Sequence, residues 1–121
     1  MKILVKIIVL IILLSSINPS VTIAQEKIKL GLLVPLSGEF SEIGKSIIKA
    51  ALLATNKIDS SLIEIIPKDT ESNPEITYER AKELQKIGVK IVIGPVFNKN
   101  LIKLEKLSDM TFLSLTNKII D

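Results

Sequence analysis

Hydroxyl, amide and carboxylate side chains follow each predicted strand of this chain, and they are its best candidates for contact with a ligand. Ligands of open parallel sheets bind at the carboxyl ends of the strands, near the point where the strand order reverses. Free main-chain N–H groups and positive helix ends at such an edge favour a carboxylate or another small anion. We therefore expect a binding site for a small ligand, with Ser37 as one contact. The four strand exits are Pro35–Ser37, Lys68–Thr70, Gly94–Asn98 and Ser114–Asn117.

A simpler interpretation of the same residues stays open. Ser37, Ser41 and Asn98 are of the residue types that cap helices and stabilise turns. On that interpretation they hold the backbone and contact no ligand.

The composition excludes several kinds of chemistry. The 121 residues include no histidine and no cysteine, so histidine acid–base catalysis, thiol nucleophiles, disulfides and Cys/His metal sites are all excluded. Without Lys2 and Lys6, which lie near the N-terminus, 14 basic residues face 13 acidic ones, and this balance provides no basic surface for nucleic acid. We expect a protein that is not an enzyme, holds no cofactor or metal, and does not bind nucleic acid.

Two motifs suggest catalysis but have simpler explanations. Ser46-Ile47-Ile48-Lys49 spells the S-x-x-K of serine acyl-transfer enzymes, yet it lies in a predicted amphipathic helix and neither S-D-N nor K-T-G follows. Asp69 and Glu71 form a carboxylate pair in a polar loop after Pro67, where solvated carboxylates are common. Two carboxylates without a further ligand make a poor metal site.

The N-terminal segment has the layout of a secretory signal peptide. A basic start is followed by an unbroken apolar run over Ile7–Leu14, then by Pro19 and by small residues ending at Ala24. The alternative is a membrane anchor, but Ile3–Ile17 is shorter than the roughly 20 apolar residues that span a bilayer. We expect cleavage after Ala24 and a soluble product outside the cytoplasm, with no membrane anchor after cleavage. No cysteine is present to carry the lipid of a lipoprotein.

The rest of the chain alternates between strand and helix patterns. Ile28–Val34 reads as a strand buried on both faces and ended by Pro35. A helix is expected from Ser41 or Glu42, and a second strand over Leu62–Ile66 is expected to close at Pro67. The expected buried face of that helix consists of Ile43, Ile47, Ala50 or Ala51, Ala54 and Ile58.

The second half continues this alternation. Asn73 is the expected N-cap of a helix with Pro74 at its first position, and Gly88 is its expected C-terminal glycine. Strands over Val89–Ile93 and Thr111–Leu115 flank a third helix. The order βαβαβαβ predicts an α/β fold, an open parallel sheet with flanking helices and right-handed crossovers. The expected buried residues are Tyr78, Ala81, Leu84 and Ile87 in the second helix and Leu101, Leu104 and Leu107 in the third.

In their order and spacing these pieces resemble the type 1 periplasmic binding proteins, in the branch of the leucine/isoleucine/valine-binding proteins of ABC transporters. The resemblance covers residues 27–117 and implies that residues 25–121 form part of the N-terminal lobe of such a protein, in a truncated copy. It is carried by Ile28–Gly38, Gly44, Asp69 with Asn73-Pro74, Val89–Pro95 and Leu113–Asn117.

The resemblance also implies a function and a site. Such proteins lie in the periplasm, close two lobes around a small amino-acid-like or anionic ligand, deliver it to an ABC permease and perform no chemistry. In amino-acid-binding members the ligand meets the loop after the third strand and the segment just after the fourth, and a side chain of the first loop adds a contact. The corresponding residues are Asn98, Ser114, Leu115 and Thr116, with Ile43 for the first loop.

Some positions depart from that pattern. Asn98 stands where a serine is usual, and Ile43 where an aromatic residue is common. Gly94-Pro95-Val96-Phe97 and Phe112-Leu113-Ser114 resemble a sister group with the same fold, the penicillin-binding protein activators. That group regulates peptidoglycan synthesis through protein contacts, so the alternative partner is a cell-wall synthase.

Overall fold

Strand β1 (Ile28–Val34) lies in the middle of the fold because its second half is apolar on both faces. The computed structural model describes residues 1–7, 26–58 and 61–116. Within these ranges β1 pairs in parallel with β2 (Ile63–Asp69) on one side and with β3 (Ile91–Ile93) on the other. β4 (Thr111–Leu113) pairs in parallel with β3, which gives the order β2-β1-β3-β4. The predicted α/β fold with an open parallel sheet is confirmed.

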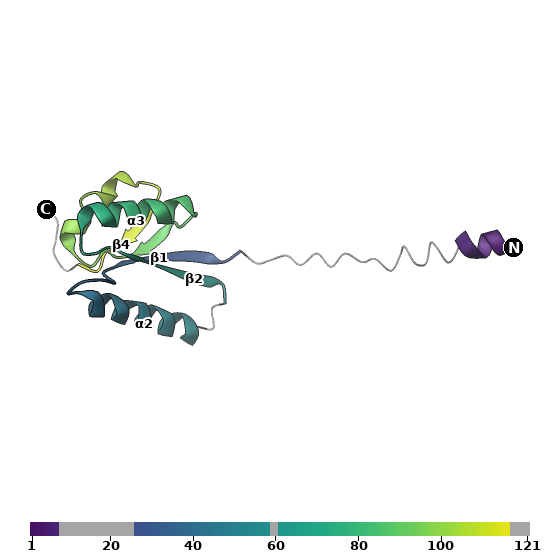
Figure 1. The fold of residues 1–121 in the computed structure, drawn as a ribbon, viewed down its shortest axis with the longest axis horizontal. Coiled ribbons are helices and arrows are strands. Elements are labelled where there is room, and N and C mark those ends of the chain that lie inside the picture. The colour runs from purple at the N-terminus through teal and green to yellow at the C-terminus, as the bar shows by residue number, and fades with distance from the viewer. Residues whose placement is uncertain (8–25, 59–60, 117–121) are drawn as a thin grey trace.

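Helices cover the two faces of the sheet. α2 (Ser41–Lys57) lies on one face and α3 (Pro74–Lys86) on the other (Figure 1). Successive residues of a strand point to opposite faces, so Leu33 packs on the α3 side, and Leu32 and Val34 face α2. The core of the α3 side consists of Leu33, Ala81, Leu84, Val89, Val92, Leu104, Leu107 and Met110.

The ends of α3 follow the signals in the sequence. The Asn73 side-chain oxygen accepts hydrogen bonds from the N–H groups of Glu75 at 2.8 Å and Ile76 at 3.2 Å, and Pro74 occupies the first helical position. Gly88 has a φ of +84°, the left-handed conformation that glycine adopts just after a helix. Both predictions are confirmed, but Ile87, which we expected to be buried, is 44% exposed.

The third crossover contains no α-helix, so the expected order βαβαβαβ is wrong at this point. Two short 3₁₀ turns, η1 (Asn98–Asn100) and η2 (Leu104–Lys106), stand there instead. The N–H groups of Leu104 and Leu107 bond to the carbonyls three residues earlier. A 3₁₀-helix has three residues per turn, so residues i and i+3 lie above one another. Leucines spaced by three therefore share one face of such turns and can pack in the core without a full α-helix.

Four strand boundaries also differ from the prediction, the first being the start of β2 at Ile63 rather than Leu62. β2 continues through Pro67 to Asp69, because β2 is an edge strand and an edge strand tolerates the missing proline N–H. β3 begins at Ile91 rather than Val89, and β4 ends at Leu113 rather than Leu115. Val89 is still fully buried, because it packs in the core from the turn before β3.

The buried face of α2 is rotated from the predicted one. Ile43 and Ile58 are exposed, whereas Gly44 is the one fully buried residue that the helix contributes. A Cβ at Gly44 would lie 1.8 Å from the Pro35 carbonyl oxygen. The helix therefore approaches the β1 exit through its glycine, and this contact determines which residues face the sheet: Gly44, Ile47, Ile48, Ala51 and Thr55.

The predicted signal peptide lies only partly within the described residues. Residues 2–7 are helical, and the rest of the predicted signal peptide, residues 8–24, lies outside the described residues. Among the helices of the described ranges, none has the length and apolar character that a bilayer crossing requires.

Candidate functional site

Asp69 joins the first two strand exits. Its carboxylate accepts hydrogen bonds from the N–H groups of Leu36 at 2.8 Å and Glu71 at 2.9 Å. Burial by itself would raise the pKa of Asp69, but these two bonds, with further hydrogen bonds from Ser37, outweigh it and hold that pKa below its ordinary value. Asp69 is therefore not the solvated loop carboxylate that we expected; it fixes the β1 exit to the β2 exit.

An aromatic pair joins the first exit to the third. The rings of Phe40 and Phe97 meet edge to face, with their centroids 4.9 Å apart. Such pairs stabilise a contact beyond the area that they bury. The pair gives this edge of the sheet an apolar wall, which no motif in the sequence indicated.

The third exit carries side-chain amides without partners. Asn98 is half-buried, and its Oδ1 atom is buried and accepts no hydrogen bond from the residues that the structure describes. Asn100 is completely buried, and neither its oxygen nor its nitrogen has a partner within the described part of the chain. A buried amide oxygen without a donor is unfavourable, and this distinguishes Asn98 from the other polar residues of this edge.

The segment that follows β4 is hydrogen-bonded to the segment that follows β3. The Leu115 N–H donates to the Pro95 carbonyl at 3.1 Å, and the Thr116 N–H donates to the Ser114 hydroxyl at 3.2 Å. Ser114 and Leu115 are exposed and Thr116 is half-buried. The Gly94 N–H also donates to the Leu113 carbonyl at 2.9 Å, and Gly94 lets the third exit approach β1, because its φ is +111° and a Cβ there would lie 2.2 Å from the Leu33 carbonyl oxygen.

Most of the predicted site residues lie at this one edge of the sheet. Ser37, Asn98 and the segment Ser114–Thr116 follow three different strands, and the contacts described above link those exits. Ile43 instead lies in the first turn of α2, in a groove along the exposed flank of that helix that Ile47 and Ala50 also line. Whether these residues contact a ligand remains a prediction.

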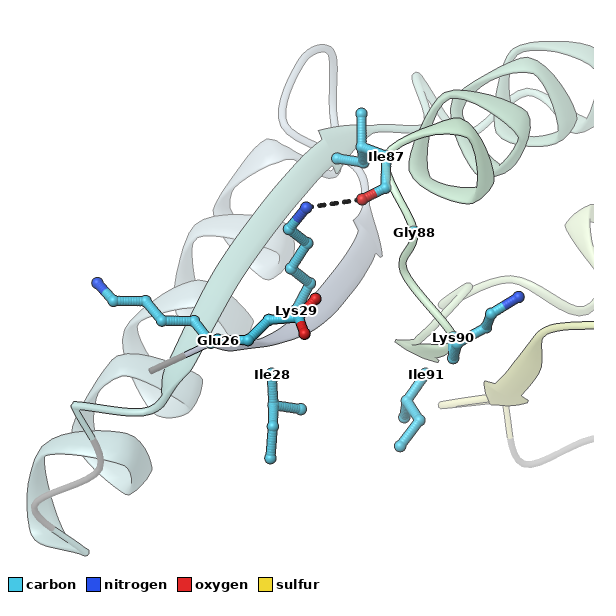
Figure 2. Close-up of a pocket in the computed structure, with 8 residues that line it drawn as sticks. Glu26, Ile28, Lys29, Ile87, Gly88, Lys90 and Ile91 are labelled. Atoms are coloured by element: carbon cyan, nitrogen blue, oxygen red, sulfur yellow. Dashed lines mark hydrogen bonds between the residues drawn. The ribbon is translucent and has the colours of Figure 1, made fainter. Parts of the chain in front are cut away.

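A separate hollow of about 340 Å³ lies at the opposite end of the strands (Figure 2). The Lys29 ammonium group donates to the Ile87 carbonyl there at 2.8 Å, at the end of α3. Lys90 is 3.4 Å from Asp109. Lys27 and Glu26 line the hollow as well, so its charged lining includes a carboxylate beside the three lysines. In the described ranges no three acidic side chains lie close enough to hold a metal ion.

Comparison with known proteins identifies the fold. A family model described as periplasmic binding protein matches residues 27–106. A search of curated sequences finds no match. Three solved structures that match are an ABC transporter substrate-binding protein from Sphaerobacter thermophilus, a solute-binding protein of an ABC transporter from Rhodopseudomonas palustris BisB5 in complex with 3,4-dihydroxybenzoic acid, and the LpoA C-domain from Haemophilus influenzae, a regulator of PBP1A.

The matches are distant and partial. The Sphaerobacter protein is 20% identical to this chain over 74% of its length, with a TM-score of 0.68. The Rhodopseudomonas protein is 29% identical over 68% of this chain, with a TM-score of 0.63. The LpoA domain is 24% identical over 74% of this chain, with a TM-score of 0.62. The chain spans about a quarter of each, namely 26%, 24% and 28% of their lengths. The likeness to the first and third shows the shared fold alone. The family match and the common parallel sheet show that the chain belongs to the type 1 periplasmic binding proteins.

Proposed function

We propose that this chain supplies the first part of a ligand-binding lobe for an ABC transporter, and that the ligand carries both a carboxylate and a hydrogen-bond donor. The observation that carries the proposal is the buried Oδ1 of Asn98 at the carboxyl edge of the sheet, which has no hydrogen-bond partner within residues 1–7, 26–58 and 61–116. An amide oxygen accepts from an ammonium or a hydroxyl group. The hydroxyl of Ser114 lies at the neighbouring exit and keeps its proton as a donor suited to a carboxylate, whereas the Ser37 hydroxyl already donates to Asp69.

The aromatic pair narrows the class of ligand. Phe40 and Phe97 place an apolar wall beside these polar groups, which suits a ligand whose carboxylate is attached to an apolar or aromatic body. The Rhodopseudomonas solute-binding protein holds such a compound, 3,4-dihydroxybenzoic acid. Amino acids and hydroxylated aromatic acids are therefore the two classes to test first.

The site of action follows from the family and from the N-terminal segment. We propose that residues 1–24 export the chain to the periplasm and are removed after Ala24, leaving a protein without a lipid anchor. The partner would be an ABC permease, and the lobe would hold its ligand without chemical change.

A thermal-shift experiment with the chain from Gln25 onward tests the proposal. Binding to the folded state raises the melting temperature with ligand concentration. We expect a rise with millimolar aliphatic amino acids or hydroxybenzoates, and loss of that rise in Asn98→Ala. The matched control is Asn56→Ala, which removes an exposed amide from α2 and should leave the rise unchanged. Absence of any rise across both ligand classes would contradict the proposal.

A regulator of cell-wall synthesis is the second candidate. The segment Gly94-Pro95-Val96-Phe97 resembles the penicillin-binding protein activators, and LpoA, a regulator of PBP1A, is among the structures with this fold. This candidate predicts that the exported chain co-purifies with a cell-wall synthase and shows no thermal response to small ligands. The two experiments together distinguish the candidates.

A further inference from the structure

Asn100 ends the turn η1 with a side chain that is 0% exposed. Neither its amide oxygen nor its amide nitrogen has a hydrogen-bond partner among the described residues. Because no surface of Asn100 is exposed, its surroundings are complete within this chain, and a further segment cannot reach the amide unless the turn moves. A buried amide without hydrogen bonds is unfavourable, and such departures from good packing are expected at functional positions.

The other buried polar side chains of the described residues do have partners. The Thr77 hydroxyl donates to the Asn73 carbonyl at 2.7 Å. The Thr70 hydroxyl accepts from the Ser72 N–H at 3.4 Å. The unpaired amide of Asn100 is therefore a feature of η1 and not of the buried polar groups of this fold in general.

The turn links Asn100 to Asn98 at the candidate site. The Asn100 N–H donates to the Phe97 carbonyl at 3.0 Å, and the Leu101 N–H donates to the Asn98 carbonyl at 2.9 Å. Asn98, at the start of the turn, carries the buried Oδ1 atom that also has no partner in the described ranges. Because these bonds join the two ends of one short turn, a movement that brings a donor to Asn98 moves Asn100 as well.

The hydrogen bonds of η1 all lie within the turn. The third exit is bonded to β4 and to the segment after it through Gly94 and Pro95. Over residues 96–102, by contrast, we find no hydrogen bond to any other described segment, and the next tie along the chain is the ion pair of Lys103 with Glu75. Segments with few such bonds open at a low cost in free energy. The turn η1 can therefore shift without breaking a hydrogen bond to the sheet.

We propose that Asn100 is a positioning residue for the ligand, and that it acts through Asn98; this inference rests on the proposed function. When a donor of the ligand binds the Oδ1 atom of Asn98, η1 shifts and takes the Asn100 amide out of its unpaired position. Binding thereby relieves an unfavourable feature of the free protein, so the ligand favours the shifted turn and gains affinity from it. The Phe97 ring, next to the turn, transmits the shift to Phe40 at the first exit.

Isothermal titration calorimetry and urea unfolding of the chain from Gln25 onward test the proposal, with leucine and 3,4-dihydroxybenzoate as the compounds. Asn100→Leu should raise the urea midpoint and yet weaken binding by about tenfold or more, because the free protein then has no unpaired amide to relieve. A merely structural role predicts that stability and affinity change in the same direction. The matched control is Thr77→Val, which removes a buried hydroxyl that has a partner. It should lower the midpoint and leave the dissociation constant unchanged.

Amide hydrogen exchange without ligand gives an independent measurement. The N–H groups of residues 100 and 101 close the turn, so their protection factors report how often η1 opens. Relative to the amides of β1, these protection factors should rise about tenfold in Asn100→Leu, since the turn then packs without an unpaired amide. The same ratio should be unchanged in Thr77→Val.

Two results would overturn the inference. One is an Asn100→Leu chain that binds its compound as tightly as the wild-type chain, and the other is a turn that is equally protected in both. If Asn100→Leu fails to fold, Asn100→Ala removes the same amide without adding bulk, and both measurements apply to it. A wild-type chain that binds neither compound contradicts the proposed function instead, and the exchange ratio then decides the inference on η1 by itself.

Discussion

Gly44→Ala tests how α2 positions the first strand exit. In the structure a Cβ at this position would lie 1.8 Å from the Pro35 carbonyl oxygen, 2.7 Å from its carbon and 3.1 Å from a methyl group of Leu36. To bring the first of these contacts to 3.0 Å, the helix or the exit must move by about 1.2 Å. The exit cannot move freely, because the Leu36 N–H is bonded to Asp69.

The expected loss of stability follows from this geometry. Overpacking costs about 1–3 kcal/mol, and a contact with backbone lies at the upper end because no side-chain rotamer relieves it. This cost is partly offset because alanine favours the helical conformation by about 1 kcal/mol relative to glycine. The net loss is therefore about 2 kcal/mol, a large share of the roughly 5–15 kcal/mol that stabilises a small domain.

Urea unfolding measures this loss. With a slope of about 1–2 kcal/mol per molar urea, the midpoint should fall by about 1–2 M. The control is Gly88→Ala, where the φ is +84° but nothing lies within 4 Å of the added Cβ, so only the left-handed backbone is penalised, by about 1 kcal/mol. If Gly44→Ala is less destabilising than Gly88→Ala, the close approach of α2 to Pro35 does not hold the first exit.

Three further predictions concern single side chains. Asn73→Ala should lower the free energy of unfolding by about 1 kcal/mol through loss of the α3 cap, seen as a melting temperature about 4–8 °C lower. The pKa of Asp69 is lowered in the folded state, so the stability that its ionised form contributes is present at neutral pH and is lost as the pH falls through that lowered value. The difference in unfolding free energy between the wild-type protein and Asp69→Ala should therefore be largest at pH 7 and should shrink below about pH 4; a constant difference would show that ionisation is irrelevant. Asn100→Leu replaces a buried amide, which has no partner among the described residues, by an apolar side chain of similar size. We expect chemical denaturation to show a gain of about 1 kcal/mol in the free energy of unfolding, whereas a loss would mean that the amide has a partner in solution.

Local signals predicted much of the fold. Asn73-Pro74 and Gly88 act within a few residues of their own positions, and the structure places the ends of α3 where they indicate. The apolar run Ile28–Val34 predicted a central strand because a strand that is buried on both faces is recognisable from its own apolar residues, without knowledge of its neighbours.

The errors arose where distant contacts override local periodicity. The spacing of Leu101, Leu104 and Leu107 fits both an α-helix and successive 3₁₀ turns, so the spacing alone does not distinguish the two. The rotation of α2 depends on the contact between Gly44 and Pro35, which hydrophobic periodicity ignores. A glycine inside an amphipathic helix was the available signal for that contact.

The candidate site was only partly predictable for the same reason. The topology rule indicated the carboxyl edge, and the structure joins the predicted exits there. The roles of Asp69 and of the Phe40–Phe97 pair depend on contacts between segments far apart in the sequence, so composition and spacing could not reveal them. A carboxylate directly after a strand, within reach of the neighbouring exit, was the one usable signal for Asp69.

The most direct test of ligand binding at the carboxyl edge is a nuclear magnetic resonance titration of the isotopically labelled chain from Gln25 onward, with leucine and with 3,4-dihydroxybenzoate. Binding at this edge predicts that the amide signals of Ser37, Asn98 and the segment Ser114–Thr116 move most, with a saturating dependence on one of the two compounds. Signals that move only around Lys29 and Lys90, at the opposite end of the strands, would contradict the account, as would a spectrum unchanged at millimolar ligand.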